Sequence, residues 1–322
     1  MGVALGGIIA CGLVYTLIGA VVQATGTGWI ERFMPPVVTG AVVAVIGLNL
    51  ASIPIKNMAP TGFDAWMQAI TFVSVALVAV LTRGMVQRLL ILMGLIVASV
   101  IYAVLTNGMG LGKPLDLSGV ANAAWFGLPA FSSPVFSANA MLLIAPVAVI
   151  LVAENLGHIK AVTAMTGKNL DQYMGRAFMG DGVATMVSAS MGGTGVTTYA
   201  ENIGVMAATK IYSTAVFLVA ACMAVLLGFS PKFGALIQAI PLAVMGGVSI
   251  VVFGLIAVAG AKIWVDNKVD FGDNKNLLVA AITLVLGTGD FTLKFGDFAL
   301  GGIGTATFGA IGLYALLNRK AG

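Results

Sequence analysis

Long apolar runs dominate this chain and constrain its fold more than any other feature. A membrane-spanning helix needs roughly 20 apolar residues to cross a hydrocarbon core of about 30 Å. Nine runs approach or reach that length, at 3–23, 34–55, 65–82, 89–106, 138–157, 211–229, 241–260, 276–292 and 298–317. Only 9% of the residues are charged, whereas a soluble domain carries about 25%. Because backbone polar groups must be satisfied within the bilayer, the sequence predicts an all-α polytopic membrane protein.

A broken segment follows a weaker apolar run at 177–191. It consists of a glycine-rich stretch at 192–195, four residues of strand character at 196–199 and a helix that opens on Glu201. Four strand residues at about 3.3 Å and eight helical residues at about 1.5 Å cover roughly 25 Å, enough for one crossing. The weaker run and the broken segment bring the count to eleven spans. Non-helical backbone at membrane depth must line a cavity or be buried in protein, so the break is the predicted binding site of a transporter.

Basic residues fall unevenly on the two sides of these spans. With the C-terminus inside, twelve Lys and Arg residues lie in the inner loops and four in the outer loops. Because basic residues concentrate on the cytoplasmic side of membrane proteins, we predict a cytoplasmic C-terminus. The net charge of +4 concerns this topology and does not indicate nucleic-acid binding.

Two stretches of the chain look like copies of each other. One begins at Pro36 and the other at Pro241, and each leads to a Gly-Leu pair, at Gly47 and at Gly254. The copies are seven spans apart, and an odd-numbered repeat implies inverted topology, a common plan among transporters. Two repeats of seven spans make fourteen. We therefore expect three N-terminal spans to be missing from this chain, which would then transport poorly or not at all by itself.

Two of the three glutamates lie in apolar surroundings. Glu154 ends the run 142–153, and Glu201 opens the helix after the break. A charged residue at the centre of a membrane helix costs about 2.5–3.5 kcal/mol on insertion scales, so its presence indicates function. The alternative for Glu154 is a place at the headgroup level, because Lys160 follows six residues later.

The two carboxylates have unequal environments. Free N–H groups and the helix dipole stabilise Glu201 as an anion, and the same N–H groups could donate to a ligand carbonyl. Glu154 lacks that help, so burial favours its neutral form and suits it to carry a proton. His158 follows Glu154 by four residues on the same helical face and could relay the proton. The alternative for His158 is a polar residue that faces the headgroups.

A metalloenzyme within the membrane is the alternative from another class. Glu154 and His158 could supply two ligands, but the chain has no second histidine and no convergent cysteine pair, so the ligand set is too small. We therefore predict no enzyme activity, no metal and no cofactor, with protons as the coupling ion. Asp181 is interpreted as a capping or interfacial residue, and Phe253, on pattern alone, as a packing residue.

Several motifs are specific enough to indicate a family. The first is Thr197-Thr198-Tyr199-Ala200-Glu201-Asn202-Ile203-Gly204, and the second is Ala153-Glu154-Asn155-Leu156-Gly157-His158. The others begin at Pro35 and at Met245. Together they resemble the signature and the eighth, fifth and twelfth spans of the nucleobase–ascorbate transporters (the nucleobase–cation symporter 2 family). The resemblance covers essentially all 322 residues and is closest to the bacterial uracil and pyrimidine permeases.

The resemblance implies a fold of two inverted seven-span repeats, divided into a core domain and a gate domain. The incomplete core is expected at 1–30 and 138–232, and the gate at 31–137 and 233–322. The ligand would lie between short strands of the third and tenth spans. The third span is expected to be absent from this chain.

The resemblance also implies roles for individual residues. The expected substrate-binding residues are Glu154, Tyr199, Ala200, Glu201 and Phe253, and the expected proton-coupling residues are Glu154, His158 and Asn202. Family members often have glycine where this chain has Ala200. The uracil branch has a tyrosine where this chain has Phe253.

These features predict proton-coupled uptake of uracil, or a related pyrimidine such as thymine, across the bacterial inner (plasma) membrane by alternating access. Uracil presents ring N–H donors beside carbonyl acceptors, which a carboxylate and backbone N–H groups complement. The alternatives are a purine or xanthine permease of the same family and a truncated chain that is inactive by itself. The expected partners are the nucleobase, membrane lipid and a second copy in a homodimer, and no nucleic acid.

Overall fold

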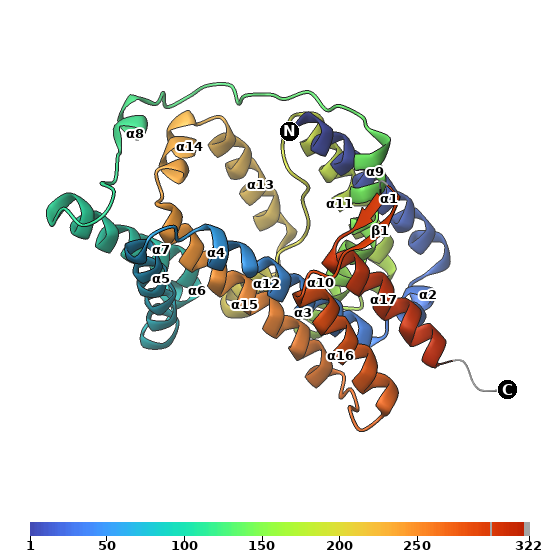
Figure 1. Ribbon diagram of the computed structural model, residues 1–322. Coiled ribbons are helices and arrows are strands. Elements are labelled where there is room, and N and C mark those ends of the chain that lie inside the picture. The colour runs from blue at the N-terminus through green and yellow to red at the C-terminus, as the bar shows by residue number, and fades with distance from the viewer. Residues whose placement is uncertain (297, 319–322) are drawn as a thin grey trace. The chain divides into compact units, whose positions relative to one another are not determined.

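The computed structural model describes residues 1–296 and 298–318, apart from the side chains of a few helix and strand residues. The chain is predominantly helical (Figure 1). Its first helices are α1 (Gly2–Thr25), α2 (Gly28–Phe33), α3 (Pro36–Leu50), α4 (Ser52–Asn57), α5 (Gly62–Leu81), α6 (Met85–Arg88), α7 (Leu90–Ala103), a π-helical turn (Val104–Gly108) and α8 (Ser118–Asn122).

The second half begins with α9 (Ala138–Ile144), α10 (Val147–Thr166), a 3₁₀ turn (Asp171–Tyr173), α11 (Met174–Ser190), α12 (Ala200–Thr209), α13 (Thr214–Gly228) and α14 (Pro231–Gln238). It continues with α15 (Leu242–Asp266), α16 (Asn274–Thr288), β1 (Leu293–Phe295), β2 (Phe298–Leu300) and α17 (Gly302–Leu317). The two strands pair antiparallel, with Leu293 opposite Leu300.

Six helical segments in the described part of the chain are long and apolar enough to cross a membrane. They are Gly2–Thr25, Pro36–Asn57, Gly62–Leu81, Leu90–Gly108, Ala138–Thr166 and Leu242–Asp266. A seventh is counted if α13 and α14, which are bent by 84° at their junction, form one span. The prediction of a polytopic helical membrane protein is therefore confirmed. The count of eleven spans and the inverted repeat stay predictions.

Glycines allow α1 and α11 to lie directly against each other. A Cβ atom placed on Gly12 would come within 2.7 Å of the carbonyl oxygen of Gly182, and one on Gly175 would come within 2.5 Å of the backbone nitrogen of Gln23. Both distances are shorter than any real van der Waals contact of a Cβ atom. Small residues are the usual means of close helix packing in membranes, where the hydrophobic effect does not drive helices together.

The chain divides into two compact units, each with its own buried residues. The first unit comprises Met1–Asn49, Phe131–Ile203 and Leu255–Gly322, and the second comprises Leu50–Ala130 and Gly204–Gly254. In the first unit, Tyr15 of α1 stacks on Phe178 of α11 with ring centroids 5.4 Å apart. The core of the second unit joins α5, α7 and α15 around Met67, Ala98, Tyr102, Ala243 and Val244. The predicted core and gate domains stay a prediction.

The two similar stretches at Pro36 and Pro241 each mark the start of a helix. Pro36 is the first residue of α3, and Pro241 directly precedes α15. A glycine soon after each proline makes a close contact, Gly40 with the Trp264 side chain and Gly246 with the Gln68 side chain. Each stretch therefore combines a proline helix start, where the missing N–H costs nothing, with a close-packing glycine.

Candidate functional site

The predicted break in the helical chain is present. The helix α11 ends at Ser190, Gly192 has φ of +94°, and α12 begins at Ala200. Only glycine adopts such a conformation without strain, and a Cβ atom on Gly192 would also come within 2.6 Å of the backbone nitrogen of Ser132. The predicted glycine-rich break and half-helix are therefore confirmed.

The strand predicted at 196–199 is not confirmed. Residues 193–199 are extended but carry no strand assignment, and the strands in the described part of the chain are β1 and β2. Strand assignment requires a ladder of backbone hydrogen bonds to a second strand. In this segment, side chains supply partners for the backbone instead.

Polar side chains on one face of α11 bond to the extended segment. The hydroxyl of Thr185 donates to the carbonyl oxygen of Val196 at 3.0 Å and accepts from its N–H at 3.2 Å. Ser188 donates to the carbonyl oxygen of Thr194 at 2.7 Å, and the Asp181 carboxylate accepts from the N–H of Thr198. These α11 residues are spaced by four and three positions, so they share one helical face.

A buried asparagine connects this face of α11 to α1 and α10. Asn155 of α10 is fully buried. Its Nδ2 atom donates to Oδ2 of Asp181 at 2.5 Å and to the hydroxyl oxygen of Tyr15 at 2.8 Å. Tyr15 in turn donates to the carbonyl oxygen of Leu151 at 3.3 Å. One amide therefore joins three helices through polar groups that would be costly to leave unpaired.

Thr198 brings His158 into the same network. The Nδ1 atom of His158 lies 2.7 Å from Oγ1 of Thr198. That hydroxyl also donates to Oδ1 of Asn155 at 3.3 Å. A hydroxyl has one proton and two acceptor positions, so it can accept from His158 while it donates to Asn155. The arrangement is a continuous chain of hydrogen bonds from α10 through the broken segment to α11.

The structure brings together some of the predicted site residues. Glu154 is half-buried on α10, one helical turn before His158 and next to Asn155. Tyr199 is 61% exposed at the end of the extended segment. Asn202 is exposed, and its backbone N–H donates to the carbonyl oxygen of Tyr199 at 3.2 Å.

The remaining predicted residues lie elsewhere or beyond the description. Ala200 and Glu201 occupy the first turn of α12, and their side chains lie outside the described part of the structure. Phe253 is a half-buried residue of α15 in the second unit. The roles of these three residues stay predictions.

Sequence reasoning missed two residues of the network, Asp181 and Tyr15. Asp181 lies in the middle of α11 and bonds to a buried amide, so its interpretation as a capping or interfacial residue is wrong. A signal was present: Asp181, Thr185 and Ser188 form a polar face on an otherwise apolar helix. Tyr15 gave no such signal, because a lone tyrosine in an apolar run is ordinary.

A metal centre finds no support in this geometry. Among residues 1–296 and 298–318, no three His, Cys, Asp or Glu side chains with a described position are grouped so that they could hold a metal ion. The nearby groups are hydroxyl, amide, imidazole and carboxylate groups bonded to one another. Such a network can hold backbone in place, orient a ligand and pass a proton along hydrogen bonds.

Comparison with known proteins gives consistent results. Residues 1–295 match the sequence profile of a family described as "Permease family". The "Putative pyrimidine permease RutG" of Escherichia coli (strain K12) is 69% identical over 99% of this chain and 72% of its own length. The "Uracil permease" of Paenibacillus larvae is 41% identical over 98% and 76% of the two chains. The "Uracil permease" of Escherichia coli (strain K12) is 38% identical over 97% and 73%.

Proposed function

Since this chain belongs to the Permease family and is a multi-pass membrane transporter rather than an enzyme, we propose that it takes up uracil or a related pyrimidine across the bacterial inner membrane. The observation that carries the proposal is the 69% identity to a putative pyrimidine permease over almost the whole chain. The hydrogen-bond network around Thr198 supports it, because that network holds the broken segment in which the binding site is expected.

The ligand chemistry proposed for the site follows from the groups at the break. Uracil is a neutral, planar ring with N–H donors beside carbonyl acceptors. Glu154 and Glu201 accept hydrogen bonds from the ring N–H groups, and the free N–H groups at the start of α12, beginning at Ala200, donate to a ring carbonyl. Tyr199 and Phe253 are the other two residues proposed to bind the substrate. This arrangement binds a nucleobase without requiring a net charge on the ligand.

Proton coupling is assigned to α10. Glu154 carries the coupling proton, and His158 passes it along the helical turn that separates the two side chains. The contact between His158 and Thr198, at 2.7 Å, links a change in the imidazole to the segment that precedes Tyr199. Loading of a proton thereby favours the ligand-binding arrangement of the break, with Asn202 beside it on α12.

The transport step in this proposal is alternating access, in which a core domain moves against a gate domain around one site. Each domain takes spans from both proposed inverted repeats, and the two similar stretches that begin at Pro36 and Pro241 both fall in the proposed gate domain. With the C-terminus in the cytoplasm, the excess of inner Lys and Arg residues obeys the positive-inside rule.

The test is uptake of radiolabelled uracil by cells that lack their own uracil permease. The chain is expressed as it stands and with any coding sequence found directly upstream, and its amount in the membrane is measured in parallel. We expect uptake that a proton uncoupler abolishes and that Glu154→Gln removes. Glu31→Gln is the matched control. Glu31 lies on α2 and is a half-exposed ion-pair partner of Lys160, so this substitution should leave uptake nearly unchanged.

Three results would contradict parts of the proposal. Uptake of xanthine or a purine in place of uracil would assign the chain to the alternative specificity within the family. If protein present in the membrane neither transports nor binds any labelled nucleobase, the assignment of the site fails altogether. Retention of uracil uptake by Glu154→Gln would remove Glu154 from the site but leave the substrate unchanged.

A further inference from the structure

The first unit contains a cavity that has no part in the site described above. Its volume is about 220 Å³, and every residue that lines it is apolar. The lining includes Ile18 of α1, Trp29 and Phe33 of α2, Val152 of α10, and Phe308 and Ile311 of α17. Cavities of about 150 Å³ with such a lining stay dry and take up apolar molecules. The cavity therefore suits hydrocarbon and offers nothing to a polar nucleobase.

The short helix α2 covers one side of this cavity with a single face. Trp29, Ile30 and Phe33 line the cavity, and the intervening charged pair Glu31 and Arg32 lies elsewhere around the helix, as a spacing of 100° per residue requires. The helix is thus amphipathic, as are helices that lie in the plane of a membrane surface. Trp29, Ile30 and Phe33 of its apolar face line the cavity, and Glu31 on another face contacts Lys160 of α10.

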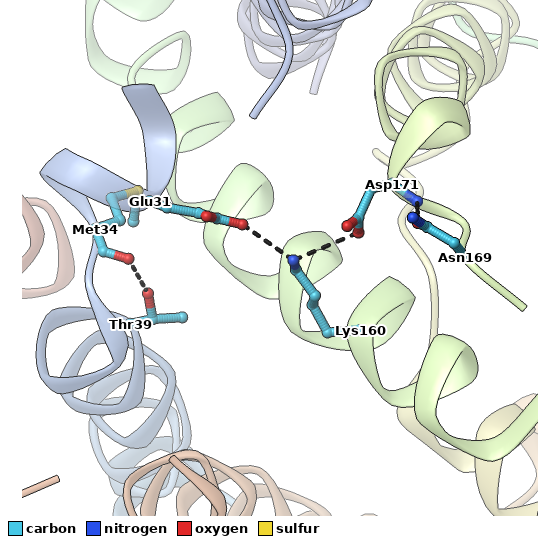
Figure 2. Close-up of polar contacts among 6 residues, drawn as sticks. All are labelled: Glu31, Met34, Thr39, Lys160, Asn169 and Asp171. Atoms are coloured by element: carbon cyan, nitrogen blue, oxygen red, sulfur yellow. Dashed lines mark hydrogen bonds and ion pairs between the residues drawn. The ribbon is translucent and has the colours of Figure 1, made fainter. Parts of the chain in front are cut away.

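Polar contacts fix α2 in this orientation, as Figure 2 shows. The Nζ atom of Lys160 on α10 lies 3.0 Å from Oε1 of Glu31 and 3.4 Å from Oδ1 of Asp171. Directly after α2, the hydroxyl of Thr39 donates to the carbonyl oxygen of Met34 at 2.9 Å. One side of the cavity is therefore formed by a helix, α2, whose position is fixed by polar contacts.

The cavity reaches the surface at two aromatic residues, and an exposed arginine follows one lining residue and precedes another in the sequence of α2. Trp29 is 38% exposed and Phe33 is 50% exposed, so the apolar interior continues to the outside between aromatic side chains. Tryptophan is enriched at the level of the lipid headgroups. Arg32 is exposed directly beside Phe33, and its planar guanidinium is suited to bidentate bonding with phosphate.

We propose that this cavity holds one acyl chain of an anionic phospholipid, with the lipid phosphate against Arg32. The acyl chain supplies the hydrocarbon that the lining requires, and the anionic headgroup complements the exposed arginine. Arg32 lies on α2, and the topology predicted from the charge bias would put it on the cytoplasmic side, so the proposed lipid comes from the inner leaflet. The proposal does not depend on which nucleobase the chain transports.

The test uses quenching of Trp29 fluorescence by brominated lipids in nanodiscs. A variant with Trp66→Phe, Trp125→Phe and Trp264→Phe keeps Trp29 alone, and a second variant keeps only Trp66, which is 73% exposed and does not line the cavity. Each is titrated with brominated phosphatidylglycerol and, separately, brominated phosphatidylcholine. We expect Trp29 to be quenched at a several-fold lower fraction of phosphatidylglycerol than of phosphatidylcholine, and Trp66 to show no preference.

Further variants test the cavity and the cation separately. Ile311→Phe fills the cavity and should weaken quenching of Trp29 by both lipids, whereas Leu316→Phe, an exposed position on the same helix, should not. Arg32→Gln should remove the preference for phosphatidylglycerol. Native mass spectrometry of the protein with its four tryptophans intact should show a retained anionic phospholipid that Ile311→Phe releases.

Three outcomes overturn the proposal. Equal quenching of Trp29 and Trp66 by both lipids would indicate ordinary surrounding lipid only. Absence of any quenching at Trp29 would mean that protein, whether a further segment or a second copy, closes the cavity. Preference for phosphatidylglycerol that survives both Ile311→Phe and Arg32→Gln would place the lipid elsewhere.

Discussion

The Nδ1 atom of His158 on α10 lies 2.7 Å from the hydroxyl oxygen of Thr198, in the extended segment that precedes α12. Through the same hydroxyl, Thr198 reaches Oδ1 of the buried Asn155. His158, which follows Glu154 by one helical turn, is thus hydrogen-bonded to a side chain of the broken segment. A change in the protonation of His158 would alter its hydrogen bond to Thr198, which directly precedes residues expected to hold the ligand.

Removal of this hydroxyl should impair transport more than stability. In Thr198→Val the contacts with His158 and Asn155 are lost, while the backbone bond from Thr198 to Asp181 remains. A hydrogen bond contributes about 1–1.5 kcal/mol net, so the uptake rate should fall on the order of tenfold. The measurement is initial-rate uptake of labelled uracil, normalised to protein in the membrane.

The neighbouring threonine provides the matched control. The Oγ1 atom of Thr197 is buried without a hydrogen-bond partner among the described residues, so Thr197→Val removes a hydroxyl that makes no such bond. It should leave the uptake rate unchanged and the protein as stable as before or more so. Equal losses in the two variants would show that any change in this segment disturbs transport, and would refute a specific role for Thr198.

Asn155 should be among the most sensitive positions for stability. In Asn155→Leu, the Asp181 carboxylate and the Tyr15 hydroxyl both lose a donor inside the protein. Leaving a buried polar group without its hydrogen-bond partner costs about 1–3 kcal/mol, and more when the group is charged, so the midpoint of thermal unfolding in detergent should fall by several degrees. Asn267→Leu, an exposed position on the turn after α15, should change the midpoint little. A midpoint for Asn155→Leu within a degree of the parent protein would contradict the network.

The helical plan of this chain followed from its sequence because apolar length is a strong signal. The predicted runs at 3–23 and 65–82 correspond to Gly2–Thr25 and Gly62–Leu81. The helix–break–helix arrangement around 190–200 followed as well, because glycine is needed where the chain leaves α11 with φ of +94° at Gly192. The strand at 196–199 was predicted but is not present. The β propensity of these residues describes each residue alone, whereas a strand also needs a second strand to pair with.

The polar network was only partly predictable. Glu154 and His158 stand out because ionisable residues are rare in apolar runs. Asn155 and Thr198 lay within recognised motifs, but no local pattern tells which side chains they meet. Tyr15 bonds across 140 residues of sequence to Asn155, and only the packing of α1 beside α10 and α11 creates that pairing.

Substitution of His158 should abolish proton-driven accumulation of uracil but not uracil exchange. In His158→Asn the amide keeps a hydrogen-bonding group near the position of Nδ1 but cannot titrate. Exchange of external for internal uracil needs no net proton movement, so it should persist, whereas accumulation driven by a proton gradient should be lost. The two rates are compared in proteoliposomes with and without an imposed pH gradient. Accumulation at the parental rate would exclude His158 from proton transfer.

Two glycines on the same helix should respond oppositely to alanine. A Cβ atom on Gly182 would come within 2.6 Å of the carbonyl oxygen of Gly12, so Gly182→Ala must push α1 and α11 apart. Such overpacking costs about 1–3 kcal/mol. Gly180, two residues earlier, has nothing within 4 Å of an added Cβ atom, and Gly180→Ala should stabilise the helix by about 0.5–1 kcal/mol because glycine has the greater conformational freedom to lose. Thermal unfolding of the two variants measures whether each substitution raises or lowers stability. If Gly180→Ala lost as much stability as Gly182→Ala, the distance between the helices would not determine the effect.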